Sequence, residues 1–183
     1  PADANEVAWA WKTILERRGG PAGIALSRQN LPVFERGSGA ASGDTLAAAS
    51  NVSRGAYVLA EAPNGSPDVI LIATGSEVQI AVEARGVLAA EGINARVVSA
   101  PSLEWFEEQD AAYRESVLPA SVTARVSIEA GINLTWRPYV GDRGRSVSIE
   151  HFGASADYKT LFREFGITTE AAVAAAKESL AAQ

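Results

Sequence analysis

The chain has 183 residues, of which 47% are hydrophobic and 21% charged, and its formal net charge is -6. This composition argues against a disordered chain, which would contain fewer apolar residues, and against a nucleic-acid partner, which needs a basic surface. The lack of cysteine excludes disulfides, thiolate metal sites and cysteine nucleophiles, and it fits a cytoplasmic protein. No apolar run approaches the roughly 18 residues of a membrane helix, so we also expect no membrane partner.

Residues 1–35 predict one helix followed by one strand. Asp3 or Asn5 can cap a helix whose apolar residues recur at helical spacing and which ends at the Gly-Gly-Pro sequence of 19–21. The apolar run at 23–27 then suits a buried strand. One helix and one strand are too few to fold alone. Because the sequence also lacks methionine, we interpret this segment as the end of a domain in a longer protein.

The composition changes at residues 36–52, which are rich in Gly, Ser and Ala and contain few large apolar side chains. We predict a linker here, in which residues 45–49 could form a helical turn. An α/β pattern begins after this linker and continues to the end of the chain. Residues 53–183 are therefore expected to form a complete domain.

Strands and helices alternate in this second part. The run at 69–74 is apolar on both faces, as in a central strand covered by helices, whereas the run at 57–61 suits an edge strand. The alternation implies parallel pairing and a three-layer α/β/α sandwich. Ser76 and Gln79 have the spacing of a capping box, and Thr169 is the expected cap of the last helix. The remaining strands are expected at 95–99, 124–130 and 146–150. Helices are expected between Ser76 and Gly92, and at 111–117, 158–165 and 170–182.

The first candidate site is the turn Thr74-Gly75-Ser76-Glu77, where a predicted strand ends and a helix starts. Open α/β sheets bind ligands at such ends, and free N–H groups there attract anions. The turn has one glycine, no phosphate-loop lysine, and a glutamate that would repel an anion. A plain strand-to-helix turn is therefore the favoured interpretation.

Other polar residues give weaker signals. His151 is the only histidine, so a zinc site is disfavoured, and nothing marks the nearby Ser155 as an activated nucleophile. A structural or surface histidine is favoured. Glu129 and Glu150 lie near the ends of neighbouring predicted strands and could act as paired carboxylates. The tryptophans do not alternate with basic residues, so we assign them to packing or interfaces. They are Trp9, Trp11, Trp105 and Trp136.

The sharpest local feature is the polar turn that follows the run at 23–27. Arg28 carries a planar fork of donors that can bind a phosphate through two hydrogen bonds. Gln29 and Asn30 could add directional hydrogen bonds. The alternative is that Arg28 forms a structural ion pair and that the polar residues only open a loop. From the residues alone, both interpretations stand.

The sequence Ser-Arg-Gln-Asn-Leu-Pro at 27–32 strongly resembles the transketolase family, and further matches continue along nearly the whole chain. Taken together, these motifs are highly specific. They favour transketolases over related enzymes such as pyruvate dehydrogenase components and deoxyxylulose-phosphate synthases. The other matching motifs are PADANE at 1–6, IATGSEV at 72–78, RVVS at 96–99, QDAAYR at 109–114, SVLP at 116–119, IEAG at 128–131 and FGASA at 152–156.

The resemblance implies both a fold and an activity. Residues 1–35 would be the end of the pyrimidine-binding domain, and residues 53–183 the C-terminal domain, whose family fold is a mixed five-stranded sheet with one antiparallel edge strand. Transketolases transfer a two-carbon ketol unit between sugar phosphates in the pentose phosphate pathway. They work as homodimers with thiamine diphosphate and a divalent cation, Mg²⁺ or Ca²⁺.

Of the family's functional residues, the resemblance carries over Arg28 alone, as the arginine that binds the phosphate of the sugar substrate. No catalytic, cofactor-binding or metal-binding residue has a counterpart, and no role is carried over to His151. We therefore expect an inactive fragment that by itself binds neither thiamine diphosphate nor a cation. Its roles would be packing against the remainder of the transketolase chain and dimer contacts. The alternative is a regulatory small-molecule-binding module, with its site near Gly75, Gly131 and Gly153.

Overall fold

A computed structural model describes residues 1–42 and 44–182. Gly43, in the expected linker, and Gln183, at the end of the expected domain, lie outside the described residues. The described residues include a five-stranded sheet in the order β1-β3-β2-β4-β5. Its strands are β1 (Tyr57–Ala60), β2 (Val69–Ala73), β3 (Ala95–Ser99), β4 (Arg125–Ile128) and β5 (Arg145–Val147).

The sheet is mixed. β1 runs antiparallel to β3 at one edge, whereas β2, β3, β4 and β5 pair in parallel. β2 lies at the centre of the sheet, and every residue in it is buried because helices cover both of its faces. This arrangement confirms the predicted five-stranded sheet with one antiparallel edge strand.

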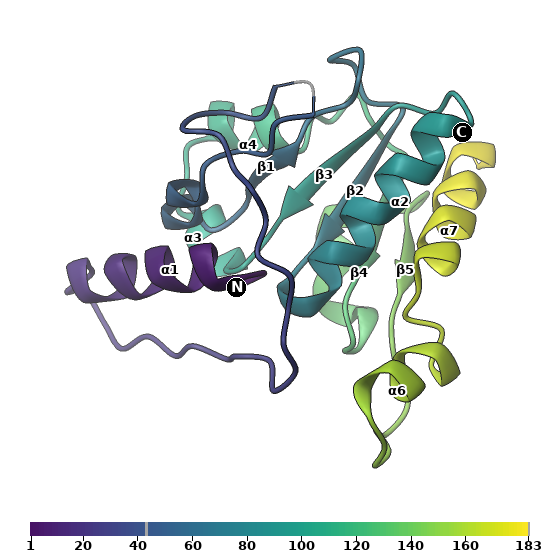
Figure 1. Cartoon of the computed structure of the whole chain (residues 1–183). Helices are drawn as coiled ribbons and strands as arrows, with labels where there is room; N and C mark the ends of the chain where they lie inside the picture. Colours follow the sequence, from purple (N-terminus) through teal and green to yellow (C-terminus); the bar gives the residue numbers. More distant parts are fainter. Residues whose placement is uncertain (43, 183) are drawn as a thin grey trace.

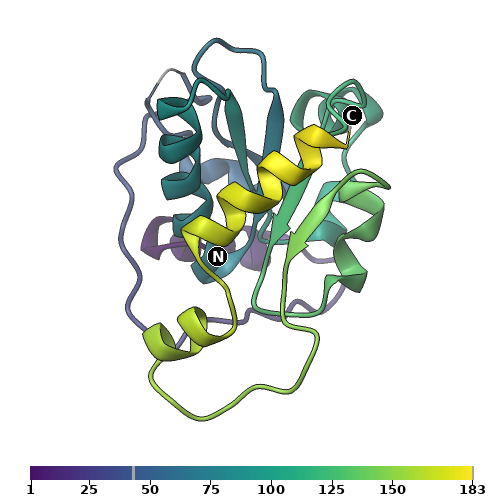
Figure 2. The same cartoon turned by 90° about the vertical axis from the view of Figure 1, so that its right-hand side faces the viewer.

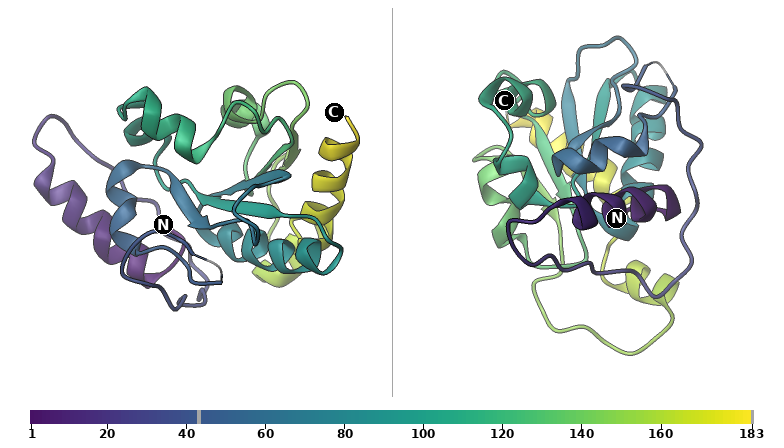
Figure 3. Two further views of the ribbon diagram at one scale, coloured as in Figure 1. Left: turned by 90° about the horizontal axis from the view of Figure 1, so that it is seen from above. Right: turned by 90° about the vertical axis from the view of Figure 1, so that its left-hand side faces the viewer.

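Helices form a layer on each face of the sheet. They are α2 (Val78–Ala90) and α7 (Thr169–Ala181) on one face, and α3 (Leu103–Glu107), α4 (Ala111–Val117) and α5 (Arg137–Val140) on the other. Figures 1 and 3 show the two layers, and Figure 2 shows α7 beside α2. Ile70 and Ile72 point into one core and Leu71 into the other, because successive side chains of a strand face opposite sides. The α/β/α sandwich is therefore confirmed.

The start of α2 differs from the prediction. Ser76 and Gln79 form no capping box, because the chain first makes a short 3₁₀-helix, η2 (Gly75–Glu77), and α2 begins after it. The Ser76 hydroxyl donates to Glu77 Oε1 at 3.0 Å, and Gln79 Nε2 donates to the Ser76 carbonyl at 3.0 Å. Both side chains are thus directed away from the backbone N–H groups that a capping box would satisfy.

The other helices agree more closely. α4 has the predicted bounds, and α6 (Tyr158–Glu164) ends one residue early. α7 begins one residue early, and its cap is Thr168, whose hydroxyl accepts a hydrogen bond from Ala171 N at 3.2 Å, so the assignment of Thr169 as the cap is wrong. Two short helices, α3 and α5, and the 3₁₀-helix η3 (Asn133–Trp136) were not predicted, because four or five residues are too few to show helical periodicity. Among the described residues, no helix has both the length and the apolar character needed to cross a membrane.

The segment before the sandwich begins with α1 (Ala4–Glu16). Asp3 caps it, since its Oδ1 accepts from Glu6 N at 2.8 Å. The strand predicted at 23–27 is wrong, because these residues pair with no described strand. A strand needs a neighbouring backbone for its N–H and C=O groups, and none lies beside this run. Figure 1 shows the chain leaving α1 and returning beneath it as a single extended segment.

The predicted linker at 36–52 packs onto the sandwich. Ala47 and Val52 are each 1% exposed and belong to the same core as α2 and α7. The helical turn expected at 45–49 forms later, as the 3₁₀-helix η1 (Ala49–Arg54), because Thr45 is already engaged in a β-bridge with Ser42.

Candidate functional site

Arg28 lies in an extended stretch, residues 18–33, that joins α1 to the linker. Its side chain is exposed, and no hydrogen bond or ion pair joins it to another described residue. The structural ion pair considered as the alternative therefore does not occur within the described part of the chain. Leu26 and Val33, on either side of it, are 57% and 60% exposed. Arg28 is thus free to meet a ligand from outside this chain.

The stretch around Arg28 is anchored at its two ends. At the upstream end, Arg17 Nη2 donates to both carboxylate oxygens of Glu108 at 2.6 Å, and its guanidinium lies 4.9 Å from the centre of the Trp105 ring. At the downstream end, Phe34 N donates to Asp3 Oδ2 at 3.1 Å, and the Asn5 side chain donates to the Phe34 carbonyl at 3.0 Å. At both ends, the stretch is thus attached to residues that pack against the sandwich.

A buried polar network lies behind the downstream anchor. Glu6 is fully buried and its Oε1 accepts hydrogen bonds from the Tyr57 hydroxyl at 2.6 Å and the Ser99 hydroxyl at 2.7 Å. Arg36 Nη1 donates to the same Tyr57 hydroxyl at 2.6 Å. Burial and the charge of Glu6 raise the pKa of Tyr57, so this phenol stays protonated and donates to the carboxylate.

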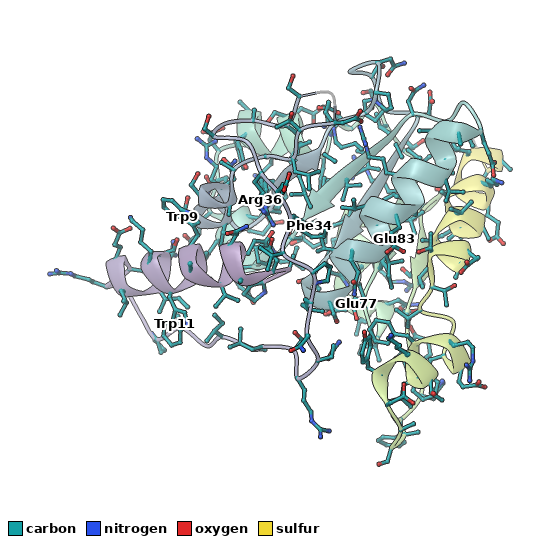
Figure 4. All side chains as sticks on the ribbon, in the orientation of Figure 1. Trp9, Trp11, Phe34, Arg36, Glu77 and Glu83 are labelled. Atoms are coloured by element: carbon teal, nitrogen blue, oxygen red, sulfur yellow. The ribbon has the colours of Figure 1, made fainter. Side chains whose placement is uncertain are left out.

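Arg36 balances the charge of two buried carboxylates. Its Nη2 lies 3.1 Å from Asp3 Oδ1 and 3.5 Å from Glu6 Oε1, and the side chains of Asp3 and Glu6 are both fully buried. Figure 4 shows Phe34 and Arg36 between the start of α1 and the sheet. Sequence reasoning identified Asp3 as a helix cap but missed the rest of this network, because its members lie up to 93 residues apart. No local pattern marks such a contact.

A cavity of about 700 Å³ lies beside this stretch, between α1, residues 21–27 and the carboxyl ends of β2 and β4. Its lining includes Ser27, next to Arg28, and all four residues of the predicted strand-to-helix turn, 74–77. The turn thus lies at the sheet edge where ligands of open α/β folds bind. The carboxylates of Glu77 and Glu129 line it as well, which disfavours an anionic ligand there.

Glu129 and Glu150 each accept a hydrogen bond from a residue of η3. Trp136 Nε1 donates to Glu129 Oε2 at 2.6 Å, whereas Glu150 Oε1 accepts from Asn133 N at 2.9 Å. Burial raises the pKa of Glu77 to about 6, an effect that the Ser76 hydroxyl reduces and the charge of Glu129 increases. Glu129 and Glu150 thus each have a hydrogen-bond partner of their own near η3.

The remaining candidates occupy structural or surface positions. His151 is exposed, with Nδ1 2.7 Å from the Phe152 carbonyl and its ring edge-on to Phe165. Gly153 lies in the same exposed loop, far along the chain from Gly75 and Gly131. In the part of the chain that the structure describes, no group of three or more His, Asp or Glu side chains is placed to hold a metal ion. We assign none of the described residues to a metal or cofactor site.

Two tryptophans pack within the chain and two lie on its surface. Trp136 is 2% exposed, and Trp105 lies under the guanidinium of Arg17. Trp9 and Trp11 of α1 are 37% and 47% exposed. Figure 4 shows them on opposite sides of that helix.

The buried Glu77 carboxyl predicts a pH-dependent stability. Its pKa of about 6 in the folded chain exceeds the ordinary 4.5, so the folded chain binds the proton more tightly than the unfolded chain. The contribution of this carboxyl to stability is present below pH 4.5 and lost as the pH rises through 6. Glu77→Gln should therefore raise the free energy of unfolding at pH 8 by up to about 2 kcal/mol, since one pKa unit corresponds to about 1.4 kcal/mol.

Urea denaturation of the 183-residue chain at pH 4.5 and pH 8 measures this difference. Glu83, exposed on the same helix (Figure 4), provides the matched control, because Glu83→Gln makes the same chemical change at a side chain that is not buried. If Glu77→Gln changes the free energy of unfolding by the same amount at both pH values, Glu77 ionises in the folded chain as it does in the unfolded chain.

Comparison with known proteins identifies the sandwich. Residues 55–168 match the family model described as the transketolase-like TK C-terminal domain. The chain belongs to this family. The match begins close to β1 and ends at Thr168, the cap of α7, so it includes the whole sheet of the transketolase domain.

Full-length transketolases align over nearly the whole chain. The transketolase of Mycobacterium tuberculosis is 55% identical over 98% of this chain and 25% of its own length. Transketolase 1 of Escherichia coli is 52% identical over 98% of this chain and 26% of its own length. The crystal structure of the Pichia stipitis transketolase complex with sedoheptulose-7-phosphate has a TM-score of 0.84 at 35% identity, and the match covers 99% of this chain and 24% of that one.

The chain therefore spans about a quarter of the length of these transketolases. Arg28 lies outside the residues that match the domain family, 55–168, but within the alignment to the complete transketolases. The similarity thus extends through α1 and the stretch around Arg28 as well as through the sandwich.

Proposed function

We propose that this chain is the C-terminal portion of a transketolase that transfers a two-carbon ketol unit between sugar phosphates in the pentose phosphate pathway. The observation that carries this proposal is the alignment of 98% of the chain with transketolases at up to 55% identity. A related transketolase has been solved as a complex with sedoheptulose-7-phosphate, which makes a sugar phosphate the natural substrate class. A cytoplasmic location is proposed with it.

In this proposal, residues 1–35 end the pyrimidine-binding domain, residues 36–52 are a linker and residues 53–183 form the C-terminal domain. Thiamine diphosphate and Mg²⁺ or Ca²⁺ would be held by the rest of the transketolase, where they supply the chemistry of ketol transfer. The chain alone would be inactive, and it would contribute domain packing and contacts in a homodimer. Exposed Trp11 and Leu26 support a packing role, since large apolar side chains favour contact with another surface.

Arg28 would bind the substrate phosphate. Its guanidinium is exposed and has no partner among the described residues, so both edges of its donor fork are available for a phosphate. Binding energy from this remote group would orient the reacting carbons against the cofactor. No observation favours the alternative of a regulatory module, because the sheet edge near Gly75 and Gly131 is lined with carboxylates.

Replacing Arg28 by alanine in the intact transketolase tests this role. KM for a ketose phosphate donor should rise roughly 10- to 100-fold, because hydrogen bonds to a charged group contribute about 1.5–3 kcal/mol. KM for hydroxypyruvate, which has no phosphate, should stay within about twofold when the acceptor is an unphosphorylated aldehyde. Steady-state kinetics with both donors measures the two values.

Arg18 offers a matched control in the same stretch. It is also exposed and has no partner among the described residues, so Arg18→Ala removes the same charge ten positions away. This variant should leave KM for both donors unchanged. Equal losses with both donors in Arg28→Ala, or equal effects of the two arginine variants, would contradict phosphate binding by Arg28.

A further inference from the structure

The stretch that carries Arg28 has few fixed points. No hydrogen bond or ion pair joins residues 18–33 to any other described residue, and Ile24 supplies an apolar contact with the core. On the downstream side, the hydrogen bonds nearest to Arg28 are those of Phe34, six residues further along the chain. The position of Phe34 therefore limits where the loop after Arg28 can run.

The sandwich controls the position of Phe34 through α1. Phe34 N donates to Asp3 Oδ2, and the Asn5 side-chain amide donates to the Phe34 carbonyl. Residues at the start of α1 therefore bind both backbone polar groups of Phe34. The start of α1 is held in turn by Glu6, whose Oε1 accepts from Tyr57 on β1. These contacts connect a residue of β1 to the loop that carries Arg28.

Tyr57 occupies the centre of this connection. Its hydroxyl donates to Glu6 Oε1 at 2.6 Å and accepts from Arg36 Nη1 at 2.6 Å. The ring is 2% exposed, and Glu6 is fully buried, so water cannot replace either hydrogen bond. Arg36 also contacts Asp3 and Glu6 directly, so the Tyr57 hydroxyl belongs to a network that joins β1, the start of α1 and the segment after Phe34.

We propose that Tyr57 is a positioning residue for the substrate phosphate, acting through the network of Glu6, Asp3 and Arg36 that clamps Phe34 and thereby places Arg28. This inference rests on the proposed function, in which Arg28 binds that phosphate. It gives the C-terminal domain a part in substrate recognition. Tyr57 is buried, so it would act on the substrate only through this network.

Tyr57→Phe in the intact transketolase tests the proposal, because it removes the hydroxyl and keeps the buried ring. KM for a ketose phosphate donor should rise roughly three- to tenfold, as expected for a displaced binding group. Both kcat and KM for hydroxypyruvate with an unphosphorylated acceptor should stay within about twofold. Tyr113→Phe is the matched control, since it removes a hydroxyl that donates to the Ala56 carbonyl at 2.9 Å outside the network.

Combining Tyr57→Phe with Arg28→Ala separates the two proposals. If Tyr57 acts through Arg28, the double variant should have the same KM for the phosphorylated donor as Arg28→Ala alone. If Arg28→Ala raises this KM and Tyr57→Phe does not, the positioning role is wrong and the proposed function stands. If Arg28→Ala itself has no donor-selective effect, the proposed function fails, and the positioning inference fails with it.

A second variant, with a smaller change in the network, keeps the test valid if Tyr57→Phe prevents folding. Ser99→Ala removes the second hydroxyl that donates to Glu6 Oε1, and it changes little volume. It should raise KM for the phosphorylated donor in the same direction as Tyr57→Phe. A lower melting temperature with unchanged KM in both variants would show that the network serves stability only and would overturn the proposal.

Discussion

Replacing Arg36 by methionine should lower the free energy of unfolding of the 183-residue chain by about 3–5 kcal/mol. Asp3 and Glu6 are fully buried, and the Arg36 guanidinium lies within 3.5 Å of both carboxylates. Methionine retains much of the apolar volume of the side chain but removes the charge, so two carboxylates would remain buried without a cation. Urea denaturation followed by circular dichroism measures the loss.

The matched control is Arg163→Met. Arg163 pairs with Glu164 on α6, but the two side chains are 71% and 61% exposed, so water solvates both charges when the pair is broken. We expect a change of about 0–1 kcal/mol for this variant. If Arg36→Met were as mild as the control, then Asp3 and Glu6 would have to gain access to water, and the network would not be the buried connection described above.

Gly55→Ala should destabilise the chain by about 3–5 kcal/mol, since both backbone strain and steric overlap oppose it. Gly55 has φ of +84° and sits between η1 and β1. A Cβ at this position would lie 2.3 Å from Phe106 N and 2.3 Å from the Ser102 carbonyl oxygen, both of which are backbone atoms. The hydrogen bond from Ser102 N to the Gly55 carbonyl, 3.0 Å long, holds the two segments together. The start of α3 would therefore have to move away.

Gly65→Ala separates strain from overlap. Gly65 has φ of +75°, but a Cβ there would meet no atom within 4 Å, so only the backbone conformation opposes alanine. We expect a loss of about 1–2 kcal/mol for this control. Thermal denaturation of both variants beside the unchanged chain gives the comparison. Equal losses at the two glycines would show that the contact of Gly55 with α3 adds nothing.

Much of the fold follows from local sequence patterns. The run at 69–74 is apolar and rich in β-branched residues, and the structure places it as the central strand β2. The sheet also has the antiparallel edge strand, β1, that the resemblance to transketolases implies. Such patterns are informative because a strand covered by helices on both faces must be apolar throughout.

Local patterns fail where an element depends on a partner. Residues 23–27 have the composition of a buried strand, yet they form none, because no described backbone lies beside them. Ser76 has the spacing of a helix cap, but its hydroxyl is used by Glu77, which is itself buried by packing at the sheet edge. In both cases the residue type allows the predicted structure, and packing against other segments determines whether it forms.

The candidate site shows the same division. The sequence by itself determined the alternating strands and helices and singled out Arg28, because a donor fork in a polar turn is a local property. Only the tertiary structure decided that Arg28 has no partner within the described chain and that Glu6 meets Tyr57 and Ser99. It also decided that Trp136 donates to Glu129 and that the backbone of Asn133 donates to Glu150. These contacts depend on how distant segments pack, and burial then makes each of them strong by excluding water.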